Sequence, residues 1–191
     1  MKTPHKTGRA RPPQNQVREI LDRISRITAS EDWAGDINPT QRAALSYLAR
    51  ANRFSRSPSQ VADYLEATRG TVSQTLKALA RKDLIEEQRS EQDKRSISYA
   101  VTEDGHAALN FRTATDQAVG HLTKGQADDL ARALTHLMSD VLQARGGRSF
   151  GACRTCRHHQ KNPSGAYCVL LQEALVPAET EQICHEHAVP A

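Results

Sequence analysis

The stretch Thr68–Leu84, TRGTVSQTLKALARKDL, decides the fold, and the rest of the chain is arranged around it. Val72, Leu76 and Leu79 recur at helical spacing, which predicts a helix with one apolar face. The opposite face has no carboxylate and carries Arg69, Thr71, Ser73, Gln74 and Lys77. A half-buried helix with an acid-free outer face suits a phosphate-lined groove, although an ordinary solvated helix shows the same pattern.

Two capping signals predict the helices that lead into this stretch. Asn38 and Ser57 each precede a proline and are followed three residues later by a glutamine, which is the pattern of a capping box. The apolar faces of the two helices are Ala44, Leu45, Leu48 and Ala49 in the first, and Val61, Ala62 and Leu65 in the second. With a tight turn at 66–67, the second helix and the Thr68 helix form a helix-turn-helix.

A β-hairpin is predicted directly after this unit. Residues 84–89 leave the helix as one strand and residues 97–101 return as a second, with a polar tip at 90–96. Such a hairpin is the wing of a winged helix. Its cations, which we expect to reach phosphates or a minor groove, are Arg89, Lys94 and Arg95. Asp93 is expected to orient a nearby arginine. If that arginine is Arg95, the pair stabilises the hairpin and Arg95 does not act on DNA.

Two further helices are predicted, and each carries an apolar stripe. The stripes are larger than a small winged helix needs to cover its own core. The first lies near 17–30 and its stripe is Val17, Ile20, Leu21, Ile24 and Ile27. The second starts at a capping box at 123–126, ends at Gly146–Gly147, and has the stripe Leu130, Leu134, Leu137, Met138, Val141 and Leu142. Between the hairpin and this last helix, one helix capped at Thr102 is expected to extend to Leu122.

Composition limits the classes of function. The 191 residues carry a net charge of +4 with a pI near 9.0, which suits an anionic partner. Residues 1–13 are basic, contain no acid and are predicted to be a disordered arm, which either touches DNA phosphates or is a leader without a role. No signal peptide or membrane-length apolar run is present, so we expect a cytoplasmic protein without a membrane partner. The sequence has no nucleophile–base set, phosphate loop or metal-binding His-Glu helix, and is not expected to be an enzyme.

The order of these elements resembles the MarR (multiple antibiotic resistance regulator) family of winged-helix repressors over residues 15–145. The segments that carry the resemblance are NPTQRAALSYLARA (38–51), SPSQVADYLEATRGTVSQTLKALARKDLI (57–85) and DKRSISYAVTEDGHAAL (93–109). Asp93 and Arg95 match the family's wing pair, and residues 101–105 match its Leu-Thr-x-x-Gly with Val in place of Leu. The resemblance implies a homodimer, built from the first and last helices, that binds a pseudo-palindromic operator in double-stranded DNA.

The tail beyond Gly147 departs from that family and holds a candidate metal site, Cys153, Cys156, Cys168 and Cys184. A Cys-x-x-Cys turn aims two sulfurs at one metal, and a segment of about 40 residues has too small a core to fold without such a staple. A single pair with two separated cysteines favours an iron–sulfur cluster, but Zn²⁺ and free or disulfide-switching thiols remain open. One of His158, His159, His185 or His187 would be able to replace a cysteine ligand.

The predicted chain is therefore mainly α with a small β-wing, in three parts. These are a basic arm at 1–13, a winged-helix DNA-binding and dimerisation domain at 14–147, and a cysteine module at 148–191. We expect a sequence-specific transcriptional regulator, a repressor by its resemblance, that responds to redox state or to metal or iron–sulfur status. Because only Gly146–Gly147 separates the module from the last helix, the module is expected to act on the dimer interface, or else to be a structural staple. The alternative is a redox or structural metal protein whose winged helix mediates protein contacts.

Overall fold

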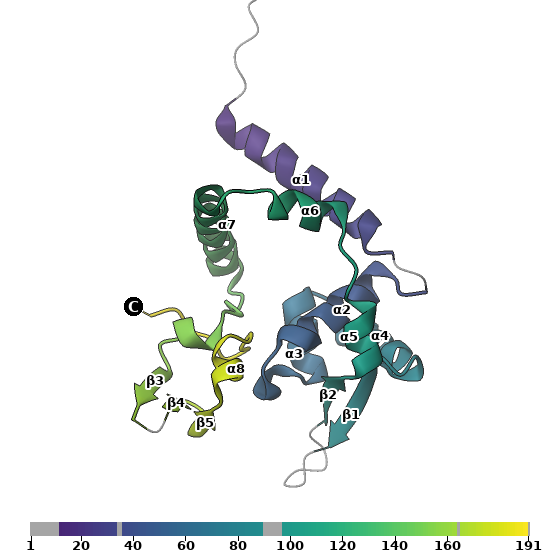
Figure 1. The fold of residues 1–191 in the computed structure, drawn as a ribbon, viewed down its shortest axis with the longest axis vertical. Helices are drawn as coiled ribbons and strands as arrows, with labels where there is room; N and C mark the ends of the chain where they lie inside the picture. Colours follow the sequence, from purple (N-terminus) through teal and green to yellow (C-terminus); the bar gives the residue numbers. More distant parts are fainter. Residues whose placement is uncertain (1–11, 34–35, 90–96, 164, 191) are drawn as a thin grey trace, which may run out of the picture.

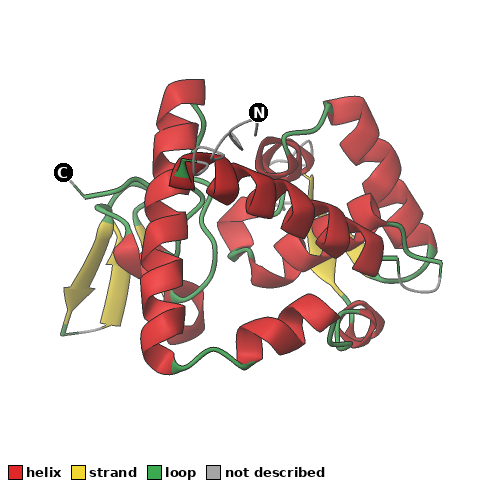
Figure 2. Cartoon of the chain, turned by 90° about the horizontal axis from the view of Figure 1, so that it is seen from above, coloured by secondary structure: helices red, strands yellow, loops and turns green. Residues whose placement is uncertain are grey.

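The computed structural model describes residues 12–33, 36–89, 97–163 and 165–190. Its first part is mainly helical, with α1 (Pro13–Glu31), α2 (Pro39–Arg50), the short 3-10 helix η1 (Arg53–Ser55), α3 (Pro58–Leu65) and α4 (Arg69–Arg81). The hairpin β1 (Ile85–Arg89) and β2 (Ile97–Val101) follows, and then come α5 (Glu103–Ala108), α6 (Ala114–Gly120) and α7 (Lys124–Arg145). The winged-helix prediction is therefore confirmed (Figures 1 and 2).

The caps that the sequence predicts determine where these helices begin. Both oxygen-to-amide bonds of a capping box are present at Asn38, Ser57 and Thr123, and Thr68 caps α4 through the backbone N–H of Thr71. A cap of this kind contributes about 1 kcal/mol, because it satisfies backbone donors that the first helical turn leaves free. Gly146 ends α7 in the left-handed conformation, as expected.

The core of the winged helix lies where α2, α3, α4 and the hairpin meet. Val72, Leu76 and Leu79 of α4 are at most 1% exposed and pack with apolar side chains of α2 and α3. The strands pair antiparallel from Ile85 opposite Val101 to Arg89 opposite Ile97. The tip of the predicted wing, residues 90–96, lies outside the described residues, as does most of the basic arm. Pro13, which we had placed in the arm, is the first residue of α1.

One predicted element is wrong. The single helix expected from Thr102 to Leu122 is interrupted at 109–113, where the chain turns between α5 and α6. The cause is local: Thr113 forms a second N-cap, in which its hydroxyl accepts from the N–H of Asp116 at 3.0 Å and its own N–H donates to the carboxylate of Asp116 at 2.9 Å. Arg42 of α2 stacks over Phe111 at 3.8 Å and pairs with Asp32, which holds this break against the winged helix.

Gly105 is required by the close approach of α5 to Leu84, in the connection between α4 and β1. A Cβ atom at this position would lie 2.1 Å from the backbone oxygen of Leu84 and 2.7 Å from Cγ1 of Val101. We therefore expect Gly105→Ala to lower the free energy of unfolding by about 1–3 kcal/mol, measured by urea denaturation. Gly125→Ala is the matched control: its Cβ meets nothing within 4 Å and alanine favours the helix. Equal stability of the two variants would contradict this reading of Gly105.

The cysteine module adds a second sheet that the sequence did not predict. After the 3-10 turn η2 (Cys153–Thr155), the strands β3 (His159–Asn162), β4 (Gly165–Cys168) and β5 (Glu173–Leu175) form an antiparallel meander, and the short helix α8 (Pro177–Thr180) follows. Among the apolar residues of the module, Leu175 is buried, but Val169 and Leu170 are 38% and 47% exposed. The module therefore has a very small core of its own, as expected.

The module packs against the winged helix rather than against α7 alone. Ile183 bonds α2 through its N–H to the oxygen of Arg50 at 2.8 Å, and its own oxygen accepts from Asn52 at 2.9 Å. Phe150 contacts the rings of Tyr47 and Tyr64, so both segments of the module share the winged-helix core. In Figure 1 the module lies beside α3 and below α7, while α1 and α6 lie together in the upper part of the view.

Candidate functional site

The outer face of α4 is open to solvent at the positions that the sequence predicted. Arg69, Gln74 and Lys77 are exposed, and within the described residues they make no hydrogen bond or ion pair with another side chain. Ser73 is half-buried. The hydroxyls of Thr71 and Thr68 are hydrogen-bonded at 2.9 Å, so the Thr71 side chain is partly engaged in the cap of α4. Three long polar side chains without internal partners are therefore available to an external ligand.

The wing contributes one described cation, Arg89. Arg89 is 65% exposed and pairs with Glu87 at 2.9 Å along the same strand. An exposed pair of this kind contributes little to stability, so an external phosphate is able to displace the carboxylate. Lys94, Arg95 and Asp93 lie outside the described residues, and their predicted roles remain predictions.

The apolar stripes of α1 and α7 are also open to solvent. In α1 the side chains of Val17, Ile20, Ile24 and Ile27 are 44–50% exposed, and none of its residues is buried. In α7 the exposed fractions of Leu130, Leu134, Leu137, Met138 and Val141 are 39–58%. Apolar stripes of this length on two helices normally mark a surface that another protein covers.

The four cysteines lie together in the module, and each is at most 8% exposed. None forms a disulfide. The pKa of Cys153 is raised to about 11 by its burial and by the neighbouring sulfurs of Cys184, Cys168 and Cys156. Burial also raises the pKa of Cys184, and hydrogen bonds from Asn52, the backbone N–H of Glu186 and Ser55 partly oppose this. The structure therefore brings the predicted cysteines together in one buried cluster.

Among the described residues, no group of three or more Cys, His, Asp or Glu side chains stands at metal-binding geometry. Two other features fit a thiolate-bound group nevertheless. The N–H of Ala188 donates to Sγ of Cys156 at 3.4 Å, and Nε2 of His159 is buried in the described part of the chain without a hydrogen-bond partner. His159 pairs with Cys168 across β3 and β4, so the two side chains share one face of the sheet.

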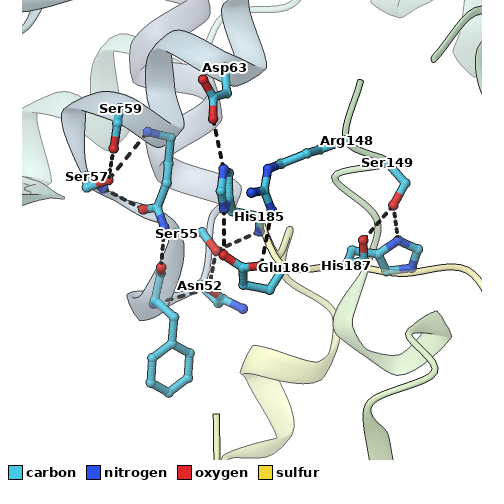
Figure 3. Close-up of polar contacts among 12 residues, drawn as sticks. Asn52, Ser55, Ser57, Ser59, Asp63, Arg148, Ser149, His185, Glu186 and His187 are labelled. Carbon is cyan, nitrogen blue, oxygen red and sulfur yellow. Dashed lines mark hydrogen bonds and ion pairs between the residues drawn. The ribbon is translucent and has the colours of Figure 1, made fainter. Parts of the chain in front are cut away.

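The other histidines of the tail have protein partners. His187 Nδ1 lies 2.6 Å from the hydroxyl of Ser149, and its Nε2 lies 3.0 Å from that of Thr155. His185 Nε2 lies 3.0 Å from Asp63 of α3, and Nδ1 lies 3.1 Å from Glu186 (Figure 3). Neither histidine is placed to replace a cysteine. Sequence reasoning missed Asn52, Ser55 and Asp63 as neighbours of the cysteine site, because they lie more than a hundred residues before it.

Comparisons with known proteins agree with this fold. A protein-family model described as MarR family matches residues 35–96, about a third of the chain. No curated protein matches the chain. In the part of the chain that the structure describes, no helix is long and apolar enough to cross a membrane.

Solved structures resemble the chain over 69% of its length. They include Staphylococcus aureus MepR in its DNA-binding conformation, at 23% identity and a TM-score of 0.55, and MepR in complex with DNA, at 23% and 0.52. Streptococcus pneumoniae FabT in complex with DNA has 22% identity and a TM-score of 0.53, and each comparison covers 99% of the other chain. The part of each chain that is compared shares the winged-helix fold. Residues 35–96 of this chain therefore match the MarR family model, and the chain has the winged helix-turn-helix fold of these solved structures.

Proposed function

We propose that this chain is a DNA-binding transcriptional regulator, not an enzyme, that works as a homodimer. The observation that carries the proposal is the outer face of α4, whose Arg69, Gln74 and Lys77 are exposed, free of acids and without side-chain partners among the described residues. Arginine and glutamine recognise base edges in a major groove, and lysine neutralises phosphates. That MepR and FabT, which have the same fold, were solved with DNA supports the same use of α4 here.

The dimer follows from the exposed stripes of α1 and α7. Two such helices from each of two protomers bury their apolar surface in a common bundle, which gains roughly 25 cal/mol per Å² of apolar area removed from water. Glu31 at the end of α1 accepts a hydrogen bond of 2.7 Å from Thr115 of α6. This bond ties α1 to α6 in the same protomer. The arrangement of the two protomers in the dimer then sets the distance between their two α4 helices. A pseudo-palindromic operator requires a fixed distance of this kind.

We further propose that Cys153, Cys156, Cys168 and Cys184 hold one thiolate-bound group, an iron–sulfur cluster or Zn²⁺. The support is the burial of all four sulfurs, the N–H bond to Cys156 and the unpartnered Nε2 of His159 beside Cys168. The bound group would supply the positive charge that a cluster of buried thiolates needs. Anaerobic purification with an absorption spectrum and metal analysis tests this: absence of iron and zinc from the folded protein would refute it.

DNA binding is tested by titrating the protein with its own promoter region at several salt concentrations. The wing makes a specific prediction: if Arg89 binds a phosphate, Arg89→Ala lowers the slope of log K against log salt by about 0.9 per contact. Glu87→Gln is the control, because it removes the partner of Arg89 and should tighten binding slightly. An unchanged slope in Arg89→Ala would show that this arginine does not reach the DNA. Absence of salt-dependent binding by the intact protein would favour a redox or structural metal protein instead.

A further inference from the structure

A pocket of about 690 Å³ opens on the surface of the cysteine module, where residues of β3, β4, β5 and α8 line it. Its volume lies within the roughly 300–1,000 Å³ that is usual for the sites of small molecules. Among the described residues that line it there is no cysteine, and none belongs to residues 35–96, which match the family model. The pocket is therefore distinct from the cysteine cluster and from the outer face of α4.

Most of the pocket wall is apolar and aliphatic. The apolar residues that form it are Ala166, Ala174, Leu175, Val176 and Pro177. The described lining residues include no Phe, Tyr or Trp, so the wall offers no benzene or indole ring on which a flat aromatic ligand would stack. A wall of small aliphatic side chains favours a ligand with an aliphatic body.

The polar part of the lining is cationic. Arg154 and Lys161 both line the pocket, and Glu181 is the carboxylate beside them. Arg154 donates through Nε to Glu181 at 2.7 Å. Within the described residues, its two Nη groups and the exposed ammonium of Lys161 have no hydrogen-bond or ion-pair partner. Because Glu181 offsets only one of the two cations, the charge of the lining favours an anionic head group.

We propose that this pocket binds a small aliphatic anion, whose body lies on the apolar wall and whose carboxylate or phosphate head binds Lys161 and the Nη groups of Arg154. Guanidinium and ammonium donors both pair with such heads, and a guanidinium does so with two parallel hydrogen bonds. Binding at this site requires neither DNA nor a thiolate-bound group. Only the use of the pocket in regulation rests on the function proposed above.

The wall of the pocket is also the part of the module that binds the connection between α2 and α3. Arg53 of η1 donates to the backbone oxygen of Ala174 at 3.1 Å and forms an ion pair with the buried carboxylate of Glu179. The same carboxylate accepts from the N–H of Val176 at 2.9 Å. Ala174 and Val176 both line the pocket, and in Figure 1 α8 lies on the side of the module that faces α3. A ligand that orders this wall therefore also holds Arg53.

The head group is tested by calorimetric titration of the intact, purified chain with four compounds that share one alkyl chain. Octanoate and octyl phosphate are expected to bind, and the tighter of the two identifies the preferred head. 1-Octanol should bind about fivefold more weakly, as expected for the loss of an exposed ion pair, and octylammonium should not bind detectably. Octylammonium binding as tight as that of octanoate would overturn the proposal.

The apolar wall is tested by filling the pocket. Ala174→Leu should abolish the heat of octanoate binding, because the larger side chain occupies the space of the alkyl chain. Ala178→Leu is the matched control: Ala178 is an exposed residue of α8 that does not line the pocket. The exposed stripes of α1 and α7 also offer apolar surface to octanoate. Binding that is unchanged in Ala174→Leu would therefore assign octanoate to such a surface and refute the site.

Lys161→Gln provides a second variant that leaves the wall intact. It should weaken octanoate binding about fivefold and leave 1-octanol binding unchanged, because only the anion uses the ammonium group. Arg157→Gln removes another exposed cation of the module, one that does not line the pocket, and should change neither. Lys161 is chosen rather than Arg154, which lies between Cys153 and Cys156. Equal octanoate affinities for wild type and Lys161→Gln would contradict the head-group assignment.

The link to the winged helix is tested by hydrogen exchange of the intact chain with and without octanoate. Octanoate should slow exchange at residues 173–181 and at 53–56, and should leave 124–145 unchanged. Protection confined to 13–31 or 124–145 would refute the site, and protection of 173–181 without 53–56 would refute the link through Arg53. None of these readouts needs DNA, so a failure of DNA binding would not be mistaken for a failure of this inference.

Discussion

The double variant Leu130→Asp/Leu137→Asp is expected to stay folded as a protomer and to lose both the dimer and operator binding. These leucines are 46% and 39% exposed in the protomer, so water can still hydrate the new carboxylates. In a dimer four carboxylates would be buried, and each buried polar group without a partner costs at least about 1–3 kcal/mol. The sum corresponds to a dimer dissociation constant more than about 1,000-fold weaker.

The measurement is sedimentation at micromolar concentration, with circular dichroism to confirm folding. Ser139→Asp/Gln143→Asp is the matched control, because these residues lie on the opposite side of α7 and are exposed. It adds the same two carboxylates and should leave the dimer intact. A dimeric Leu130→Asp/Leu137→Asp variant, or a wild-type monomer that binds the full operator, would show that α7 is not the interface.

Loss of base recognition has the second largest expected effect. Gln74→Ala removes a side chain that has no partner in the described structure, and each base contact contributes about 1–3 kcal/mol of discrimination. A dimer loses the contact in both half-sites, so we expect the preference for the operator over a scrambled duplex to fall at least about 30-fold. Arg69→Ala should reduce it similarly. Binding to the scrambled duplex should hardly change in Gln74→Ala, since glutamine carries no charge.

Arg81→Ala provides the control for the recognition helix. Arg81 is exposed in the last turn of α4, at the end away from the turn that joins α3. Its loss should weaken binding to both duplexes equally, because a cation at this end contributes only sequence-independent attraction. The assignment of α4 fails if Gln74→Ala and Arg69→Ala behave as Arg81→Ala does.

The sequence predicted those features that depend on local contacts. The caps at Asn38, Ser57 and Thr123 were predictable because the cap and the amide that it satisfies are three residues apart. The buried face of α4 follows from helical spacing alone. The break at 109–113 was missed, although Thr113 and Asp116 carry a capping signal, because the apolar residues on both sides suggested one continuous helix.

The docking of the module was not predictable, for a different reason. Asn52 and Ser55 are polar residues in a short connection, and such residues are normally exposed. Here they are buried because the chain returns 130 residues later, when His185 bonds Ser55. Considered without the later segment, Asn52 and Ser55 have the sequence pattern of an ordinary loop. The cysteines themselves were found from their spacing, but the contacts of the module with α2 and α3 were not.

The central claim is that the state of the cysteine site controls DNA binding. It is tested most directly by one operator titration at fixed salt with three proteins: the anaerobically purified protein, the same protein after chelation, and Cys153→Ser. Cofactor content is measured in each sample. We expect the purified protein to differ about tenfold in operator affinity from the other two, which corresponds to 1.4 kcal/mol of coupling, and the other two to agree with each other. Equal affinities in all three, with loss of the bound group confirmed, would contradict the account and leave the module as a structural staple.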